Sequence, residues 1–396
     1  MRNTFSGYYL PTNSDFSEIW QNCIFVFDAN VLLNLYSYSP KATKVFFSIL
    51  KKVSDRIWLP HQAALEYQDN RLKKISAQES TYEQVSSILR KTQDNLEDLL
   101  RDGHASIDVE SLLSTIQQTF SSVQNELNKH KKRHPDLFSN DSIRNELSVL
   151  FNGKVGSVYD AERLNELYKV GEQRYEYSIP PGYKDKKKED LKRFGDLTIK
   201  SKFGDLVLWM QLLDKAIESK RPILFITDDR KEDWWWDESG KTIGPRPELV
   251  TEVWQKAGVP FYMYTPTRFM ENANNYLGTN INQEIIDEVR DVSEAREGWL
   301  ERVVDALESL DGEAHLTEIY QFIQNNSQRK LSKSWQSTIR RTLYNFSSDV
   351  DAYLGGEDLF QHLGRGRWGL RRSTQHDGAT VNASESIAHL DVLPKA

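Results

Sequence analysis

The first part of the chain alternates short apolar runs with segments whose apolar residues recur at helical spacing. Residues 23–28 (CIFVFD) and 57–60 (IWLP) combine β-branched, aliphatic and aromatic side chains, as buried strands do. The segments that follow them, ANVLLNLYSYS and HQAALEYQDNRLKKI, have helical periodicity. This alternation predicts an α/β fold with a parallel sheet flanked by helices.

The same alternation returns after residue 203. Residues 204–220 predict an amphipathic helix, and 221–229 (RPILFITDD) predict a strand that ends in two acids. A helix at 246–258, a strand at 259–265 and a helix at 266–278 follow. Between the two α/β stretches, from about 70 to 180, the chain is polar with apolar residues at helical spacing. We expect a long helical insertion there, formed by a hairpin of helices.

The last part of the chain predicts a separate module. Residues 281–297 are acidic and indicate a linker helix. GWLERVVDALESL, HLTEIYQFIQNN and SWQSTIRRTLYNFSSD predict three short helices, and EDLFQHLG with GRWGLRR predicts a β-hairpin. Three helices followed by a hairpin is the order of a winged-helix domain, here 298–372. The polar residues 373–396 lack any period and indicate a disordered tail.

Composition narrows the class of protein. The chain has 396 residues, of which 28% are charged, and a net charge of −7. It has no apolar run near the roughly 18–20 residues that a membrane helix needs and no secretion signal at its start, and Cys23 is its single cysteine. We therefore expect a cytoplasmic protein without disulfides, zinc site or membrane contact. The negative charge argues only weakly against a nucleic-acid partner, because acids gathered in a metal site mask local basic patches.

Five acids are expected at the carboxyl edge of the predicted sheet: Asp28, Glu66, Asp205, Asp228 and Asp229. Ligand sites of open α/β sheets lie at that edge. Converging carboxylates repel one another unless cations neutralise them, and Mg²⁺ or Mn²⁺ prefers such oxygen ligands. Taken singly, each acid also has a structural explanation, because an Asp before a helix is often an N-cap and an Asp pair often forms a turn.

Four segments of the chain resemble, in order, the acid-bearing segments of PIN domains: FDANVLLNLY, LPHQAALEY, FGDLVLW and ITDDRKEDWW. Together with GYKD and PRPELV they are similar to the bacterial PIN-like group that is often found near anti-phage defence genes. The resemblance covers about 23–275. PIN domains carry a much shorter segment between the second and third acids, so the insertion departs from the family pattern.

The resemblance implies a function and a set of site residues. Catalysis would rest on Asp28, Glu66, Asp205 and Asp229, which with Asp228 would also bind the metal. Asn30, Lys184 and Arg230 would contact nucleic acid. The implied protein is an Mg²⁺- or Mn²⁺-dependent endoribonuclease, as a toxin or an anti-phage defence effector, with a PIN-like nuclease domain at 1–280.

Several alternatives remain beside these assignments. RFGD and KFGD are near repeats, so Asp196 is the fallback for Asp205. Asp185 and Asp233 are second-rank candidates. The tryptophans 234–236 would stack on unpaired bases or pack against the sheet.

The basic segment 329–341 leads into the third helix of the predicted winged helix. In helix-turn-helix proteins that helix enters the major groove, so Lys333, Arg340 and Arg341, with Trp335, would face nucleic acid. The arginines of GRGRWGLRR would lie on the wing. Winged helices also mediate protein contacts, which is the alternative.

The resemblance favours RNA over DNA as the substrate. Its rivals are a DNA nuclease of the same build and a catalytically idle scaffold that binds nucleic acid or protein. The partners left open are a further copy of the chain and a protein of a defence system.

Overall fold

The computed structural model describes residues 1, 4–102, 109–133, 136–238, 241–296, 299–327, 331, 335–350, 353 and 358–371. The chain divides into two compact units, Met1–Arg296 and Glu297–Ala396, which are described separately.

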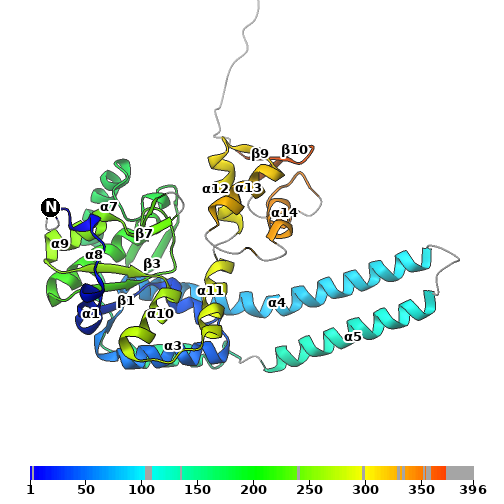
Figure 1. Ribbon diagram of the computed structural model, residues 1–396, viewed down its shortest axis with the longest axis horizontal. Coiled ribbons are helices and arrows are strands. Elements are labelled where there is room, and N and C mark those ends of the chain that lie inside the picture. The colour runs from blue at the N-terminus through cyan, green and yellow to red at the C-terminus, as the bar shows by residue number, and fades with distance from the viewer. Residues whose placement is uncertain are drawn as a thin grey trace, which may run out of the picture. The chain divides into compact units, whose positions relative to one another are not determined.

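The first unit is built on a four-stranded parallel sheet, as the sequence predicted (Figure 1). The strand order is β2-β1-β5-β8. In the register, Phe25 pairs with Ile57 on one side and with Leu224 on the other, and Phe225 pairs with Met263. Every residue of the two central strands is buried, because helices cover both faces. The strands are β1 (Ile24–Phe27), β2 (Ile57–Trp58), β5 (Ile223–Ile226) and β8 (Phe261–Tyr264).

Aromatic side chains pack the helices against the two faces of the sheet. On one face Phe25 lies against Trp20 of α1 and Phe269 of α10, with ring centroids 5.2 and 5.9 Å apart. On the other face Phe261 meets Trp209 of α8 at 5.2 Å. The helices around the sheet are α1 (Asn13–Asn22), α2 (Ala29–Asn34), α3 (Pro40–Lys52), α8 (Gly204–Ser219), α9 (Pro247–Ala257) and α10 (Pro266–Leu277).

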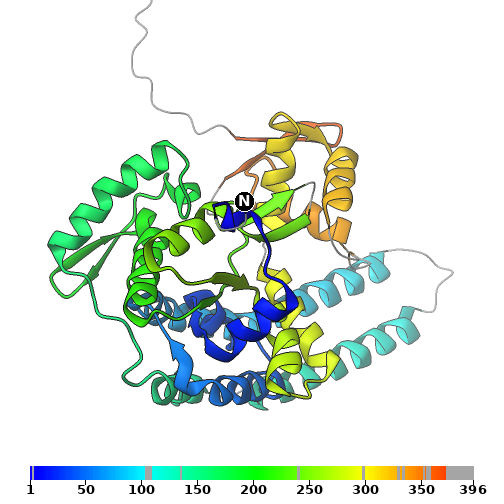
Figure 2. The same cartoon turned by 60° about the vertical axis from the view of Figure 1, so that its left-hand side comes forward.

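The expected helical insertion begins inside a helix of the sheet domain. Helix α4 (His61–Asp102) buries Ala63, Leu65 and Tyr67 in the core and then continues unbroken beyond it. Helix α5 (Val109–Arg133) lies beside it in both views (Figures 1 and 2). Helices α6 (Ser142–Leu150) and α7 (Ala161–Glu176) return the chain to the core. The α4–α5 pair is the hairpin of long helices that the periodicity predicted.

Two antiparallel hairpins were not predicted. They are β3 (Leu191–Phe194) with β4 (Leu197–Lys200), and β6 (Trp235–Glu238) with β7 (Lys241–Pro245). Both are short, and the Gly195–Asp196 pair between β3 and β4 was interpreted as part of a repeated FGD motif and not as a turn. The four short 3₁₀ helices are η1 (Ser6–Tyr8), η2 (Ser54–Arg56), η3 (Tyr183–Asp185) and η4 (Ser201–Phe203).

Helix α11 (Gln283–Arg296) is not the free linker helix that the acidic sequence suggested at 281–297. Ile285, Ile286 and Val289 are buried in the core of the first unit, and the helix packs against α3 and α10. Glu284 and Asp291 of this helix are exposed, which is why composition alone pointed to a solvated linker.

The second unit has its own core and contains three helices and a three-stranded antiparallel sheet among its described residues. The three helices and the hairpin were predicted, whereas strand β9 was not. The predicted tail 373–396 lies outside the described residues. Among the described residues, no helix is both long and apolar enough to cross a membrane. The elements are α12 (Trp299–Ser309), β9 (Glu313–His315), α13 (Leu316–Asn326), α14 (Trp335–Asn345), β10 (Phe360–Gly364) and β11 (Arg367–Leu370), with strand order β10-β11-β9.

Candidate active site at the carboxyl edge of the sheet

Asp28 lies directly after β1 and is held by three donors. Its Oδ1 accepts from the backbone N–H of Ala29 at 2.7 Å. Its Oδ2 accepts from Asn30 Nδ2 at 2.5 Å and from the Thr227 hydroxyl at 2.7 Å. Because Thr227 follows β5, the neighbour of β1, the adjacent strand ends are tied together at this carboxylate. Asp28 thus caps the N-terminus of α2 and also lies at the carboxyl edge of the sheet.

Asn30 is buried behind the acids and does not face outward, contrary to its expected role as a nucleic-acid contact. Its Nδ2 donates to Asp28 and to Thr227 at 3.2 Å, and its Oδ1 accepts from the backbone N–H of Asp228 at 2.8 Å. Its amide is therefore occupied in joining the ends of β1 and β5.

Asp228 and Asp229 point in different directions. Asp228 accepts from Asn34 Nδ2 at 2.7 Å, and its side chain is 1% exposed. Asp229 instead receives the backbone N–H of Lys231 at 2.9 Å and the Lys231 ammonium at 3.1 Å. Successive residues of an extended segment project to opposite sides, which explains the divergence. Asp229 is therefore the member of the pair that joins the other acids.

Three carboxylates converge on the ammonium of Lys231. Its Nζ lies 3.1 Å from Asp229, 3.2 Å from Asp185 and 3.5 Å from Asp205. Burial raises the pKa of Asp205 well above its ordinary value; Lys231 opposes that rise, and the acids around it reinforce it. Burial alone would lower the pKa of Lys231, but the acids outweigh it and raise that pKa. We call Asp185, Asp205, Asp229 and Glu66 the acid cluster.

Glu66 reaches the acid cluster because Gly204 leaves room for it. A Cβ on Gly204 would lie 2.9 Å from Glu66 Oε1, so any side chain there would displace one of the two. Gln62, one turn earlier on α4, donates to the same oxygen at 2.7 Å. Glu66 is also among the acids that raise the pKa of Asp205. The glycine of FGD thus lets the start of α8 approach α4.

Asp185 enters the acid cluster from a loop that Asp233 holds. The buried Asp233 carboxylate accepts from the backbone N–H groups of Gly182 and Lys184 at 2.9 and 3.1 Å. Gly182 has φ of 93°, a conformation that favours glycine. Asp233 is therefore a positioning residue. The fallback acid Asp196 is exposed in the turn between β3 and β4.

The sequence profile of the family described as "PIN like domain" matches residues 24–249, more than half of the chain. The chain belongs to this PIN-like domain family. The match runs from the first residue of β1 into α9 and includes every acid named above together with the insertion. No curated protein and no solved structure matches the chain.

Basic and aromatic candidates around the PIN-like site are engaged in other contacts. Lys184 Nζ lies 3.1 Å from Glu232, and Arg230 lies 3.9 Å from Asp228. Trp234 and Trp235 are buried, the first against Trp209. These two tryptophans therefore pack against the domain and offer no open face for stacking. Trp236 meets Tyr8 edge-on at 5.8 Å.

Among the nucleic-acid-binding candidates of the second unit, some side chains are hydrogen-bonded within the unit and others are exposed. Arg340 donates to the hydroxyls of Tyr320 and Ser337 at 3.3 and 3.0 Å, and Arg341 is exposed. Trp335 meets Tyr320 edge-on at 5.4 Å. Lys333 lies outside the described residues.

Two arginines of GRGRWGLRR are already paired with acids. Arg367 is paired with Glu313 at 3.0 Å, and Arg371 with Asp349 and Asp358 at 2.7 and 3.0 Å. Arg365, in the turn between β10 and β11, is exposed.

The donors of the PIN-like site suit a hard divalent cation. They are carboxylate oxygens, which Mg²⁺ and Mn²⁺ prefer, and they already collect around one cation, the Lys231 ammonium. In this conformation, no three His, Cys, Asp or Glu side chains of the described residues stand at metal-binding distances from a common point. Lys231 is the site residue that sequence reasoning missed, because a lysine in a polar turn carries no signal distinct from a solvated one.

Proposed function

We propose that this PIN-like protein is a metal-dependent endoribonuclease whose acid cluster cleaves phosphodiester bonds. The observation that carries the proposal is the convergence of Asp185, Asp205 and Asp229 on one cation at the carboxyl edge of the sheet. Burial and the neighbouring acids raise the pKa of Asp205, and carboxylates are costly to bring together, which favours a catalytic role over a structural one.

The residues at the carboxyl edge of the sheet would have different roles in binding the metal. Asp28, Glu66, Asp205 and Asp229 would hold Mg²⁺ or Mn²⁺, with Asp185 as an additional ligand. When bound, the ion lowers the pKa of a coordinated water and stabilises the charge that develops on the phosphate. Thr227 and Asn30 would keep Asp28 oriented through their hydrogen bonds. Asp228 faces Asn34, so we assign it to support and not to the metal.

Lys231 would balance charge in the acid cluster. Its ammonium offsets one of three adjacent carboxylates, so it competes with a divalent ion for the same oxygens. A side chain displaced from those oxygens would be within reach of an anionic substrate, because about a third of it is exposed.

The direct test is cleavage of labelled single-stranded RNA and matched single-stranded DNA by the purified full chain. Parallel reactions contain Mg²⁺, Mn²⁺ or EDTA. We expect cleavage of RNA with either ion and none in EDTA. Preferential cleavage of DNA would establish the rival substrate. Binding without cleavage under all three conditions would support the idle scaffold and overturn the enzyme.

We further propose that the second unit is a winged-helix domain that binds nucleic acid. Its elements follow the order helix, strand, helix, helix, strand, strand, and Arg341 and Arg365 are exposed on it. Each phosphate contact steepens the salt dependence of binding by about 0.7–0.9 on a log–log plot. A chain that ends at residue 296 should bind long RNA with a shallower slope than the full chain yet still cleave short RNA. Equal slopes would favour protein recognition by this unit.

A further inference from the structure

Helix α4 bonds to two different parts of the sheet domain from two of its sides. On one side Glu66 lies against the start of α8. On another side Tyr67, Arg71 and Gln78 recur at intervals of four and seven residues, so they lie along one stripe of the helix. This stripe bonds to the loop after α2 and to the start of α6. The helix that carries Glu66 is therefore held from a second direction, away from the acids.

The bonds of this stripe meet at Asp141, the N-cap of α6, where the helical insertion returns to the core. The Tyr36 hydroxyl lies 2.8 Å from one oxygen of the Asp141 carboxylate and 3.0 Å from the other. Arg71 Nη1 donates to the same carboxylate at 2.7 Å, and the Tyr67 hydroxyl lies 2.8 Å from that of Tyr36. We call Tyr36, Tyr67, Arg71 and Asp141 the clasp.

The clasp links the two elements that carry Asp28 and Glu66. Tyr36 lies two residues after α2, whose N-terminus Asp28 caps, and Tyr67 directly follows Glu66 in α4. Gln78 Nε2 donates to the carbonyl of Tyr36, so the same loop also holds α4 about three turns further along. Successive residues of a helix point about 100° apart, so bonds to Tyr67 fix the rotation of α4 at which Glu66 faces α8.

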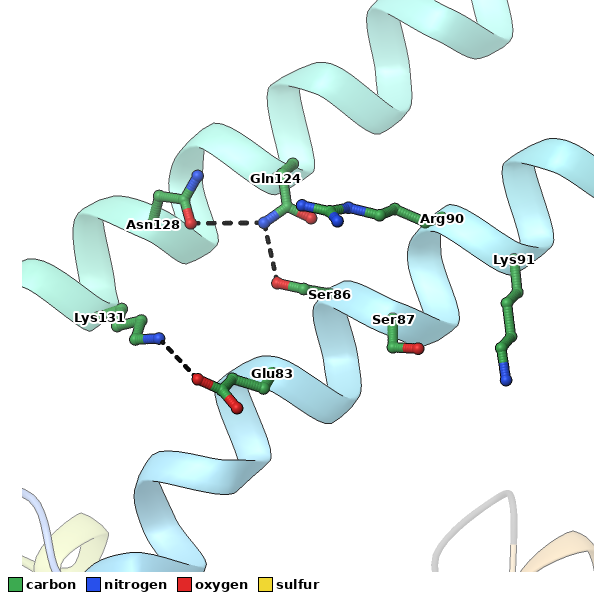
Figure 3. Close-up of a pocket in the computed structure, with 8 residues that line it drawn as sticks. All are labelled: Glu83, Ser86, Ser87, Arg90, Lys91, Gln124, Asn128 and Lys131. Carbon is green, nitrogen blue, oxygen red and sulfur yellow. Dashed lines mark hydrogen bonds and ion pairs between the residues drawn. The ribbon is translucent and has the colours of Figure 1, made fainter.

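Beyond Gln78 the side chains of α4 bond to α5 instead. Lys131 of α5 pairs with Glu83 there at 3.4 Å, as Figure 3 shows. The 24 residues from Gln78 to the end of α4 extend ~36 Å, and Figure 1 shows them running outward beside α5. A rigid element carries motion along its length, so movement of this outer part would turn or tilt Glu66 unless α4 were held near the core.

The clasp is built from polar groups in a place where apolar side chains would also pack. The Asp141 side chain is 3% exposed and that of Arg71 is 11% exposed. Burial, reinforced by Tyr67 and Asp141, raises the pKa of Tyr36 well above its ordinary value, so the hydroxyl stays protonated and donates. A buried ion pair contributes little net stability compared with apolar side chains of similar volume. The geometry that these bonds impose is therefore the better explanation for them.

From the two bonded sides of α4, we infer that the clasp is a positioning device that holds Glu66 against the start of α8 for metal binding. Tyr36 and Asp141 are its positioning residues, which act through α4 and touch neither metal nor substrate. The helical insertion thereby contributes to the site, since its return through α6 supplies Asp141. The inference rests on the proposed function, because that function assigns Glu66 to the metal.

Binding of Mn²⁺ to the full chain tests the inference without RNA, through the electron paramagnetic resonance signal of the free ion. Tyr36→Phe removes the hydroxyl at the centre of the clasp and keeps the ring. We expect it to weaken Mn²⁺ binding roughly tenfold, the lower end of the effect of residues that orient metal ligands. The matched control is Tyr159→Phe, which removes another hydroxyl that donates to a carboxylate, that of Asp214. It should also lower the melting temperature but leave the Mn²⁺ affinity unchanged.

A double-mutant cycle separates positioning from a purely structural role. If the clasp acts through Glu66, Tyr36→Phe should add little to the loss of Mn²⁺ affinity that Glu66→Gln already causes, whereas independent effects would multiply. Tyr67→Phe is the milder variant in case Tyr36→Phe does not fold, because it removes only the hydroxyl 2.8 Å from that of Tyr36. It should weaken Mn²⁺ binding in the same direction.

Three results would each overturn the inference. They are an unchanged Mn²⁺ affinity of folded Tyr36→Phe and Tyr67→Phe, an equal loss of affinity in Tyr159→Phe, and effects of Tyr36→Phe and Glu66→Gln that multiply. With RNA, Tyr36→Phe should lower kcat and leave KM unchanged, since the clasp touches no substrate. If the unaltered chain binds Mn²⁺, and Tyr36→Phe weakens that binding, but no RNA is cleaved, the proposed function fails and the clasp stands.

Discussion

Replacing Lys231 with methionine removes the cation that lies between Asp185, Asp205 and Asp229. The three oxygens lie 3.1 to 3.5 Å from Nζ, so the variant leaves carboxylates close together without the ammonium. Removing one partner of a buried ion pair costs ~3–5 kcal/mol, because the remaining charge is left uncompensated. The Lys231 side chain is 32% exposed, which places the expected loss at the lower end, about 3 kcal/mol.

Calorimetry in EDTA measures this loss. For a unit of this size, about 3 kcal/mol lowers the melting temperature by roughly 6–12 °C. Saturating Mn²⁺ should recover most of the difference, since an ion that binds only the folded chain stabilises it and replaces the lost positive charge. The matched control is Lys188→Met, which removes an exposed lysine 2.8 Å from Asp185 and should cost less than ~1 kcal/mol. Equal melting of Lys231→Met and the unaltered chain in EDTA would refute the electrostatic reasoning.

Two further predictions concern Gly204, beside Glu66, and the buried carboxylate of Glu252. Gly204→Ala should reduce RNA cleavage roughly tenfold or more, because the new Cβ would lie 2.9 Å from Glu66 Oε1 and displace that carboxylate. The melting temperature should be nearly unchanged. Full activity of the variant would mean that cleavage does not depend on the position of Glu66. Burial raises the pKa of Glu252, but Arg174, Lys256 and Trp209 bond its carboxylate and bring the pKa to about 2, below its ordinary value. The stabilisation is thus present at neutral pH and lost as the pH falls from about 4.5 to about 2, so Glu252→Gln should destabilise by about 3 kcal/mol at pH 7 and by little at pH 2 in denaturant titrations. An equal deficit at both pH values would contradict that assignment.

The parts of the fold that the sequence predicted are those with a strong local signal. Strands β1 and β5 are continuous apolar runs, which only burial between two layers of helices accommodates. Helix α11 was misinterpreted because its acids outnumber the few apolar residues, Ile285, Ile286 and Val289, that dock it. Strand β9 has three residues and is a strand only because β11 pairs with it.

The motifs pointed to some residues of the candidate site and not to those that loops supply. Glu66, Asp205 and Asp229 lie in the acid cluster and Asp196 lies at an exposed turn, while the catalytic role of these acids stays a prediction. Asp185 joins them through a loop held by Asp233, and Lys231 enters from a turn. The positions of Asp185 and Lys231 depend on how the loops fold in three dimensions, which composition and periodicity do not predict.

The most direct test of the account compares Asp205→Asn with Asp196→Asn. The two acids end near-identical segments, KFGD and RFGD, but only Asp205 lies beside Lys231, at 3.5 Å. The measurement is the rate of Mn²⁺-dependent RNA cleavage by each folded variant relative to the unaltered chain. We expect a loss of roughly 100-fold or more for Asp205→Asn and an unchanged rate for Asp196→Asn. Unchanged cleavage by Asp205→Asn would show that the acid cluster is not the active site.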